Sequence, residues 1–148
     1  MAFNSKYVSR TGLLSCSSAE FFDFITDIRN LEQFIPEGSI RNWQVNADSC
    51  SFGVPPLNSV KVRIIERIPF SLVRFSADAL KKDDFNLDVQ INDNDKRLAE
   101  VRLIVSADLN PVIDMMVSGP IDKFLETVVS EMEKFEKWNE IITGSQPL

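Results

Sequence analysis

The 148-residue sequence contains no histidine. This absence excludes histidine-based catalytic triads and Cys–His pairs, and it excludes zinc sites that use histidine ligands. The five glycines form no Gly-x-Gly pair, which excludes a dinucleotide-binding fingerprint and a phosphate-binding P-loop. Asp93-Asn94-Asp95 lacks the later glycine and glutamate of a calcium-binding loop, so it predicts a hairpin turn instead. No metal or cofactor is therefore predicted.

Cysteine is scarce as well, because only Cys16 and Cys50 are present. Neither has Cys-x-x-Cys spacing or a histidine to activate it, so we predict two small buried side chains. No signal-peptide pattern precedes Ser5, and no apolar run reaches the roughly 20 residues that span a bilayer. We expect a cytoplasmic protein without an integral membrane segment.

Positive charge is in deficit, because 16 Lys and Arg residues oppose 22 Asp and Glu residues and give a net charge of −6. Phosphate contacts need clustered basic residues, whereas these are scattered among acids, so nucleic acid is not an expected partner. Hydrophobic residues make up 44% of the chain and 11 of them are Phe, which is enough to build a core. We expect a single domain over residues 1–148, with a loose tail at 144–148.

The first part of the chain predicts one strand followed by two short helices. The strand is expected at 6–14, where Tyr, Val and Thr are mixed with polar residues. Ser17 stands three residues before Glu20 and just before an apolar run, which is the pattern of a capping box that opens a helix at 18–27. A second short helix is expected at 28–34, before a break that contains proline and glycine.

Between residues 40 and 107, apolar and polar residues alternate with a period of two, which predicts an antiparallel meander. Val73, Phe75 and Ala77, for example, alternate with polar neighbours, so one face of the sheet should be dry and the other solvated. Short polar or proline-containing turns separate the strands, which are expected at 40–47, 49–54, 60–67, 72–79, 85–92 and 97–107.

A long amphipathic helix is predicted near the C-terminal end. Asn110 suits an N-cap, and Pro111 suits the first helical position. Pro120 cannot donate to the carbonyl four residues before it, so we expect a bend, or a split that leaves a main helix at 120–141. The apolar stripe of this helix must cover the dry face of the sheet, and it consists of Ile121, Phe124, Leu125, Val128, Met132 and Phe135.

Three stretches resemble one known superfamily. They are residues 18–27 continuing to Phe34-Ile35-Pro36, residues 62–69, and Asp108-Leu109-Asn110-Pro111 with the helix through Leu125. They are similar to SRPBCC proteins, also called START-like or birch-pollen-allergen-like, which include polyketide cyclases. Among these, they look nearest to the members that are subunits of carbon monoxide dehydrogenase and to the coenzyme-Q-binding members. The resemblance and the element order imply an α+β helix-grip fold, with a curved antiparallel sheet of about seven strands beneath the long helix.

Members of this superfamily mostly share an apolar cavity between sheet and helix, so the resemblance implies such a cavity here. We expect it to bind, transport or sequester a small hydrophobic or lipid-like molecule, since pockets of this kind are mostly apolar. The expected walls are Val62, Ile64, Phe75, Leu87, Val89, Val101, Leu103, Phe124, Leu125, Val128 and Met132.

Glu66 is the charged residue that strand alternation turns toward the dry face, after Val62 and Ile64. This position makes it a candidate pocket acid or ligand anchor. The alternative is that Glu66 lies at the strand end and reaches solvent or pairs with Arg67 or Arg74, because unpaired charges are rarely buried.

Two other functions are compatible with the sequence. A cyclase-type or dehydratase-type enzyme would polarise its substrate in the same cavity, with Glu66, an Asp or Tyr7 as the acid or base. A protein-interaction or assembly module would use the outer sheet face or the 55–58 loop, with a protein partner that the sequence does not identify. Asn139, on the stripe of the last helix, is a further polar candidate for orienting a ligand.

Overall fold

The computed structural model describes residues 3–35, 38, 40–46, 48–54 and 57–138. Its antiparallel sheet has the strand order β1-β8-β7-β6-β5-β4-β3, with β2 also paired to β8. The strands are β1 (Ser5–Val8), β2 (Gly12–Leu13), β3 (Arg41–Val45), β4 (Ser49–Val54), β5 (Leu57–Ile68), β6 (Leu72–Asp78), β7 (Phe85–Asp93) and β8 (Ala99–Ala107). The helices are α1 (Ser18–Ile25), the 3-10 helix η1 (Ile28–Phe34) and α2 (Pro111–Lys134). The predicted α+β helix-grip architecture is confirmed.

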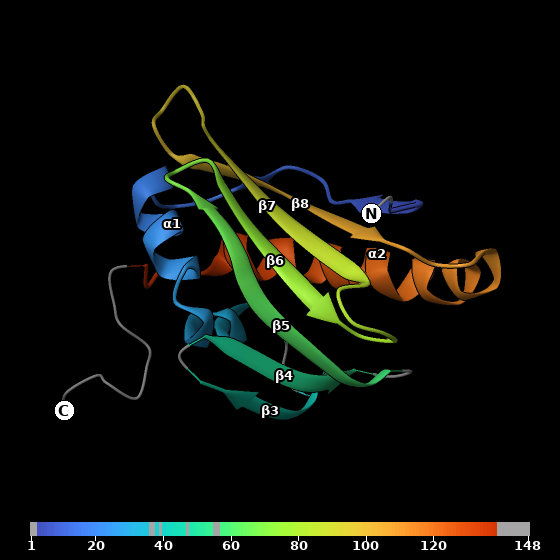
Figure 1. Cartoon of the computed structure of the whole chain (residues 1–148). Coiled ribbons are helices and arrows are strands. Elements are labelled where there is room, and N and C mark those ends of the chain that lie inside the picture. The colour runs from blue at the N-terminus through green and yellow to red at the C-terminus, as the bar shows by residue number, and fades with distance from the viewer. Residues whose placement is uncertain (1–2, 36–37, 39, 47, 55–56, 139–148) are drawn as a thin grey trace.

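The antiparallel meander predicted for the middle of the chain is confirmed between β3 and β8, where each strand pairs with the next. Val73, Val89 and Leu103 stand opposite one another across β6, β7 and β8, and all three are buried. β1 pairs with β8, so the first and last strands are neighbours. This register gives the sheet one apolar face, along which α2 runs (Figure 1).

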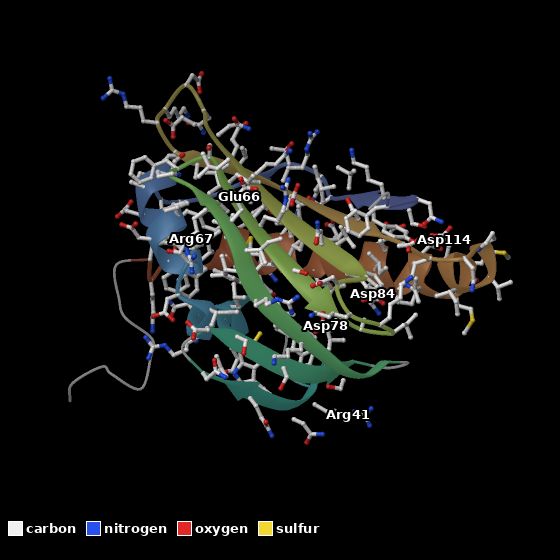
Figure 2. The ribbon with its side chains drawn as sticks, in the orientation of Figure 1. Arg41, Glu66, Arg67, Asp78, Asp84 and Asp114 are labelled. Carbon is white, nitrogen blue, oxygen red and sulfur yellow. The ribbon has the colours of Figure 1, made fainter. Side chains whose placement is uncertain are left out.

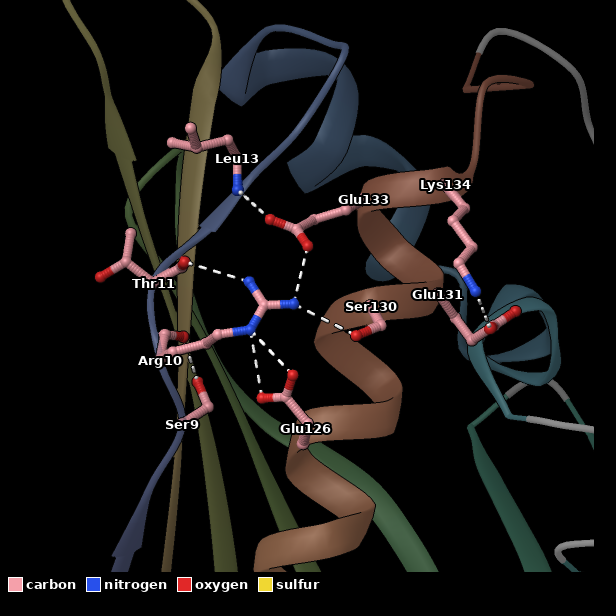
Figure 3. A network of polar contacts seen from close by, with 9 residues as sticks. All are labelled: Ser9, Arg10, Thr11, Leu13, Glu126, Ser130, Glu131, Glu133 and Lys134. Carbon is pink, nitrogen blue, oxygen red and sulfur yellow. Dashed lines mark hydrogen bonds and ion pairs between the residues drawn. The ribbon is translucent and has the colours of Figure 1, made fainter.

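The first strand is interrupted, whereas a continuous strand was expected at 6–14. β1 stops early, and β2 covers only Gly12–Leu13. Between them the Ser9 hydroxyl accepts a hydrogen bond from the Leu103 amide at 2.8 Å, and the Ser9 amide donates to the Leu103 carbonyl at 2.9 Å. A side chain thus replaces one backbone partner, and the chain leaves regular strand geometry here. Arg10, in this break, extends toward α2 (Figure 3).

α1 begins with the predicted capping box. The Ser17 hydroxyl accepts from the Glu20 amide at 3.1 Å, and the Glu20 carboxylate accepts from the Ser17 amide at 2.9 Å. The helix ends at Ile25, and η1 follows with Asp27 as its N-cap. Figure 1 shows both helices at the same end of the sheet, so the predicted pair of short helices is confirmed.

α2 begins where the sequence predicts, because the Asn110 side chain accepts a hydrogen bond from the Ile113 amide at 2.9 Å. It ends at Lys134 and not near residue 141, because Phe135 leaves helical geometry with φ −73° and ψ 138°. This change of direction places Phe135 in a cluster of aromatic rings. Each ring–ring contact stabilises the fold by about 0.5 to 1.5 kcal/mol in addition to the effect of burying apolar surface. This cluster consists of Phe21, Phe24, Phe34, Phe135 and Trp138.

α2 is continuous through Pro120, so the alternative of a split helix is wrong. Pro120 leaves the carbonyl of Met116 without its helical donor, but both residues are exposed and water can satisfy that carbonyl. Gly119 has no Cβ to meet the proline ring, which removes one of the two clashes that usually disfavour helical geometry before a proline. No helix in the described ranges, α2 included, is long and apolar enough to cross a membrane.

α2 packs on β1, β2 and β8 at one side of the sheet and on η1 at one end. Gly12 permits the close approach, because a Cβ at this position would lie 2.7 Å from Cγ1 of Val129 in α2. It would also lie 3.2 Å from Cγ1 of Val101 in β8. The interior is therefore filled on this side of the helix.

Candidate ligand-binding cavity

A cavity of about 230 Å³ lies between the sheet and α2. One water needs only roughly 10 to 15 Å³ of such space, so this cavity is far larger than a packing defect. Side chains of β3 to β8 form one wall, α2 forms another, and α1, η1 and Ile35 contribute at one end. The described lining residues are Ile25, Leu31, Phe34, Ile35, Trp43, Cys50, Phe52, Val60, Val62, Phe75, Ala77, Ala79, Phe85, Asn86, Leu87, Val89, Leu103, Val105, Val117, Pro120, Ile121, Phe124, Val128 and Met132.

Most of the side chains expected in the wall lie there. They come from four strands and from α2. Strand alternation predicts the inward face of each strand, and helical spacing predicts that of the helix. Their role in binding a ligand stays a prediction. These residues are Val62, Phe75, Leu87, Val89, Leu103, Phe124, Val128 and Met132.

Three expected wall residues do not line the cavity. Val101 and Leu125 are fully buried in the hydrophobic core, and Ile64 packs against that core. Val101 lies where Gly12 brings β2, β8 and α2 into contact, so no space is left beside it. Alternation and helical spacing predict which side chains face inward, but they do not predict which of those meet a neighbour.

Glu66 does not face the cavity, so the interpretation of this residue as a pocket acid is wrong. The pairing of β5 with β6 shifts register between Ile64 and Glu66, which leaves Ile65 as an extra residue and reverses the alternation beyond it. Glu66 stands opposite Arg74, and its carboxylate Oε1 lies 2.9 Å from Nη1 of Arg74. Figure 2 labels Glu66 and Arg67 at the end of β5 distant from Asp78. The alternative pairing with Arg74 is confirmed.

The described lining is almost devoid of polar side chains. It contains no Asp, Glu, Lys, Arg, Ser, Thr or Tyr. Asn86 is the one amide-bearing residue in it, and strand alternation turns that side chain away from the face of Phe85 and Leu87. Asn86 stands opposite Ser76 and Ser106 on the adjacent strands, in a polar row on the other face.

Cys50 and Trp43 are the remaining described lining residues whose side chains can donate a hydrogen bond. Cys50 is buried, as predicted, and burial raises the pKa of its thiol to about 12. The thiol is therefore protonated at neutral pH, and it contributes an apolar surface with a weak donor. Cys16 is also buried but lies outside the lining; burial, and next the charge of Glu20, raise its pKa to about 12.

Tyr7, the other acid or base considered for an enzyme, is likewise outside the lining. Its hydroxyl donates to the carboxylate of Asp114 in α2, and it is buried in the core. Burial first, and then the hydrogen bond and charge of Asp114, raise the pKa of Tyr7 to about 12. Tyr7 therefore joins β1 to α2. Asn139 lies outside the described residues.

Sequence reasoning missed the aromatic pair that closes the wall at the edge strand β3. Trp43 and Phe52 stack with ring centroids 6.0 Å apart and an interplanar angle of 23°. β3 has a register shift between Arg41 and Gln44, so simple alternation does not assign a face to Trp43. Phe52 was open to prediction, because it stands two residues after the buried Cys50 on the same strand.

The outer face of the sheet is polar and ion-paired. Arg74 binds Asp88 through Nε at 2.7 Å and Nη2 at 2.9 Å, and Arg63 binds Asp78 and Asp83. A protein partner on this face would meet ion pairs already formed among described residues. The other surface considered for a partner, the 55–58 loop, lies partly outside the described residues. Within the described part of the chain, no three Cys, Asp or Glu side chains are placed to hold a metal ion.

No protein-family model and no curated protein sequence matches the chain. Solved structures do match it. The KanY protein superposes with a TM-score of 0.70 and 11% identity, over 90% of this chain and 97% of that one. XoxI from Bacillus cereus has a TM-score of 0.67 and 9% identity, with 88% and 94% covered. Norcoclaurine synthase of Thalictrum flavum, solved with a transition-state analogue, has a TM-score of 0.65 and 8% identity, with 90% and 95% covered.

At these identities the likeness establishes the fold and not the activity. These neighbours have helix-grip, birch-pollen-allergen-like folds, and membership of the SRPBCC superfamily stays a prediction for this chain. The nearer resemblance to subunits of carbon monoxide dehydrogenase and to coenzyme-Q-binding members stays a prediction. The chain adopts the helix-grip fold.

Proposed function

We propose that this protein binds a small hydrophobic molecule in the cavity between its sheet and α2. The observation that carries the proposal is the cavity of about 230 Å³ with an almost wholly apolar described lining. Holding such a molecule away from water is what transport or sequestration requires. Cyclase-type chemistry has no comparable support, since neither Glu66 nor Tyr7 lines the cavity.

Water is a poor occupant of this cavity. A buried water typically makes about three hydrogen bonds, and the lining offers few groups that are free to make them. An apolar guest needs no such partners, and each Å² of apolar surface that it removes from water contributes roughly 25 cal/mol. For scale, an engineered cavity of about 150 Å³ with aliphatic and aromatic walls binds benzene.

A guest can enter where lining residues are also accessible to solvent. Pro120 is exposed, and Trp43 and Phe124 are half-buried. Pro120 is the one exposed residue of the described lining, so we place the entrance beside the middle of α2. Among the described strands β3 pairs only with β4, which makes it the lining strand that is easiest to displace.

Native mass spectrometry of freshly purified protein, followed by solvent extraction, tests for a bound apolar compound. Cavity filling then links that compound to the site. Ala77→Leu, in the wall, is expected to reduce the bound fraction at least about tenfold, because the added carbons occupy the guest's space. Ala19→Leu, on α1 and outside the lining, is the matched control. Equal retention by both variants would show that the compound binds elsewhere.

A further inference from the structure

The cavity wall is rich in aromatic rings. Six of its described residues are aromatic, drawn from η1, β3, β4, β6, β7 and α2: Phe34, Trp43, Phe52, Phe75, Phe85 and Phe124. Ring faces are negative and ring edges positive, so offset-stacked and edge-to-face contacts favour a planar aromatic guest over an aliphatic chain. A flexible chain also loses the freedom of its internal torsions when it is confined, whereas a rigid ring system has no such torsions to lose.

The same wall offers no oppositely charged side chain to an ionised guest. The described lining has no Lys, Arg, Asp or Glu side chain. The backbone N–H and C=O groups of the central strands already have partners in the sheet. Five strands pair with a neighbour on both sides: β4, β5, β6, β7 and β8. An anionic group placed here would lose its hydration without replacement. The attraction that a ring face offers a cation is also far below the cost of removing that cation from water.

Two arginines of the adjoining strands, Arg63 and Arg74, do not relieve this cost. Arg63 of β5 binds Asp78 and Asp83, and Arg74 of β6 binds Asp88 and Glu66. Both arginines alternate with inward-facing residues, so they lie on the opposite face of the sheet. An anionic headgroup inside the cavity would meet neither of them.

We propose that the cavity selects an uncharged, planar compound of one or two rings and excludes the ionised forms of the same skeleton. The volume of about 230 Å³ sets the size, since about 150 Å³ suffices for benzene. This selection rests on the proposed function and narrows its ligand class. This selectivity would distinguish the protein from carriers that bind a fatty-acid carboxylate within the pocket.

Four probes test the selection on the intact chain at pH 7: naphthalene, 2-naphthoate, 1-naphthylmethylammonium and 1-decanol. NMR titration follows the indole N–H of Trp43 and the methyl groups of Val62 and Leu87, all in the wall. The methyl groups of Leu13, which is exposed on β2 and outside the lining, are the internal control. We expect saturable binding of naphthalene, weaker binding of decanol, and dissociation constants at least about 100-fold higher for both ions.

Each other outcome overturns a defined part of the inference. If naphthoate or the ammonium ion binds within tenfold of naphthalene, charge exclusion is wrong. If decanol binds more tightly than naphthalene, the preference for planar rings is wrong, while the proposed function stands. If none of the four probes shifts a cavity resonance, the proposed function fails together with the selection.

A charge introduced into the wall should reverse the selection. Phe124→Lys, at a half-buried position of α2, is expected to improve naphthoate affinity at least about tenfold and to weaken naphthalene. Met116→Lys, exposed on the same helix and outside the lining, should change neither. If Phe124→Lys loses the circular-dichroism signal of the folded protein, Ile121→Lys is tested in its place. A folded wall variant without any gain for naphthoate contradicts the assignment of this wall as the binding site.

Discussion

Nη2 of Arg10 lies 2.8 Å from Oε1 of Glu133, and this contact joins the link between β1 and β2 to the last turn of α2. The other carboxylate oxygen of Glu133 accepts a hydrogen bond from the Leu13 amide at 3.0 Å. Arg10 also binds Glu126 through Nε at 3.0 Å (Figure 3). One acidic side chain of the helix therefore bonds two points of the N-terminal segment.

Glu133→Gln is expected to lower the free energy of unfolding by about 1 kcal/mol at pH 7, because the amide cannot accept two charge-assisted hydrogen bonds. The hydrogen bond from Arg10 holds the pKa of Glu133 below its ordinary value of 4.5. The stabilisation is thus complete above pH 4.5 and is lost as the pH falls through the lower folded-state pKa. Urea denaturation at pH 7 and at about pH 3 measures this change.

Glu131→Gln is the matched control for this prediction. Glu131 pairs with Lys134 at 3.6 Å, and the Lys134 side chain is 74% exposed, so solvent screens the pair. Its replacement should change stability by less than about 0.5 kcal/mol at either pH. Equal effects of the two substitutions would show that Glu133 has no special role in holding α2.

Tyr7 should titrate well above an ordinary tyrosine, because its pKa is raised to about 12. The folded state favours the neutral phenol, so its contribution to stability is complete below pH 10 and decreases as the pH rises from about 10 to 12. Tyr7 is the only tyrosine, so the ultraviolet absorbance of phenolate reports it alone. Asp114→Asn should lower the pKa toward 10 without reaching it, since burial remains. An unchanged titration in that variant would contradict the contact with Asp114.

Asp84 is a buried carboxylate whose partners are backbone amides. It is 1% exposed and accepts from the amides of Ala79, Leu80 and Lys81 at 2.9, 2.9 and 3.1 Å, in the turn between β6 and β7 (Figure 2). Asp84→Ala should cost about 2 to 4 kcal/mol, because these donors lose their acceptor.

Asp95→Ala, exposed in the turn between β7 and β8, is the control for Asp84. It should cost less than about 0.5 kcal/mol in urea denaturation. Asp84→Asn is expected to lie between the two, since one amide oxygen still accepts. The interpretation would be wrong if Asp84→Ala were as stable as Asp95→Ala.

Glu66→Ala should leave the affinity for an apolar guest unchanged within about twofold, because Glu66 is exposed and paired with Arg74 on the outer face. Its cost in stability should be below about 1 kcal/mol, as for other exposed ion pairs. Titration of naphthalene into this variant and into Ala77→Leu compares an outer-face position with a wall position. A large loss of affinity in Glu66→Ala would show that Glu66 contributes to the binding site.

The cavity could be anticipated in part from the sequence. Alternation assigned Val62, Leu87 and Leu103 to the dry face, and each lies in the wall. Alternation failed at Glu66, because this residue follows a register shift in β5. It assigned no face to Trp43, because that residue lies within a register shift in β3. A β-bulge adds one residue without a reliable sequence signal, and every side chain beyond it changes face.

The sequence by itself determined the local decisions: the capping box at Ser17 and the cap at Asn110, the order of the elements, and the side of each regular strand that is dry. These follow from contacts within a few residues and from the two backbone periods. Only the tertiary structure decided that α2 ends at Lys134 and passes through Pro120, that Glu66 faces outward, and that a cavity remains beneath the helix. These outcomes depend on which surfaces meet across the fold, and Gly12 shows how one absent side chain sets that distance.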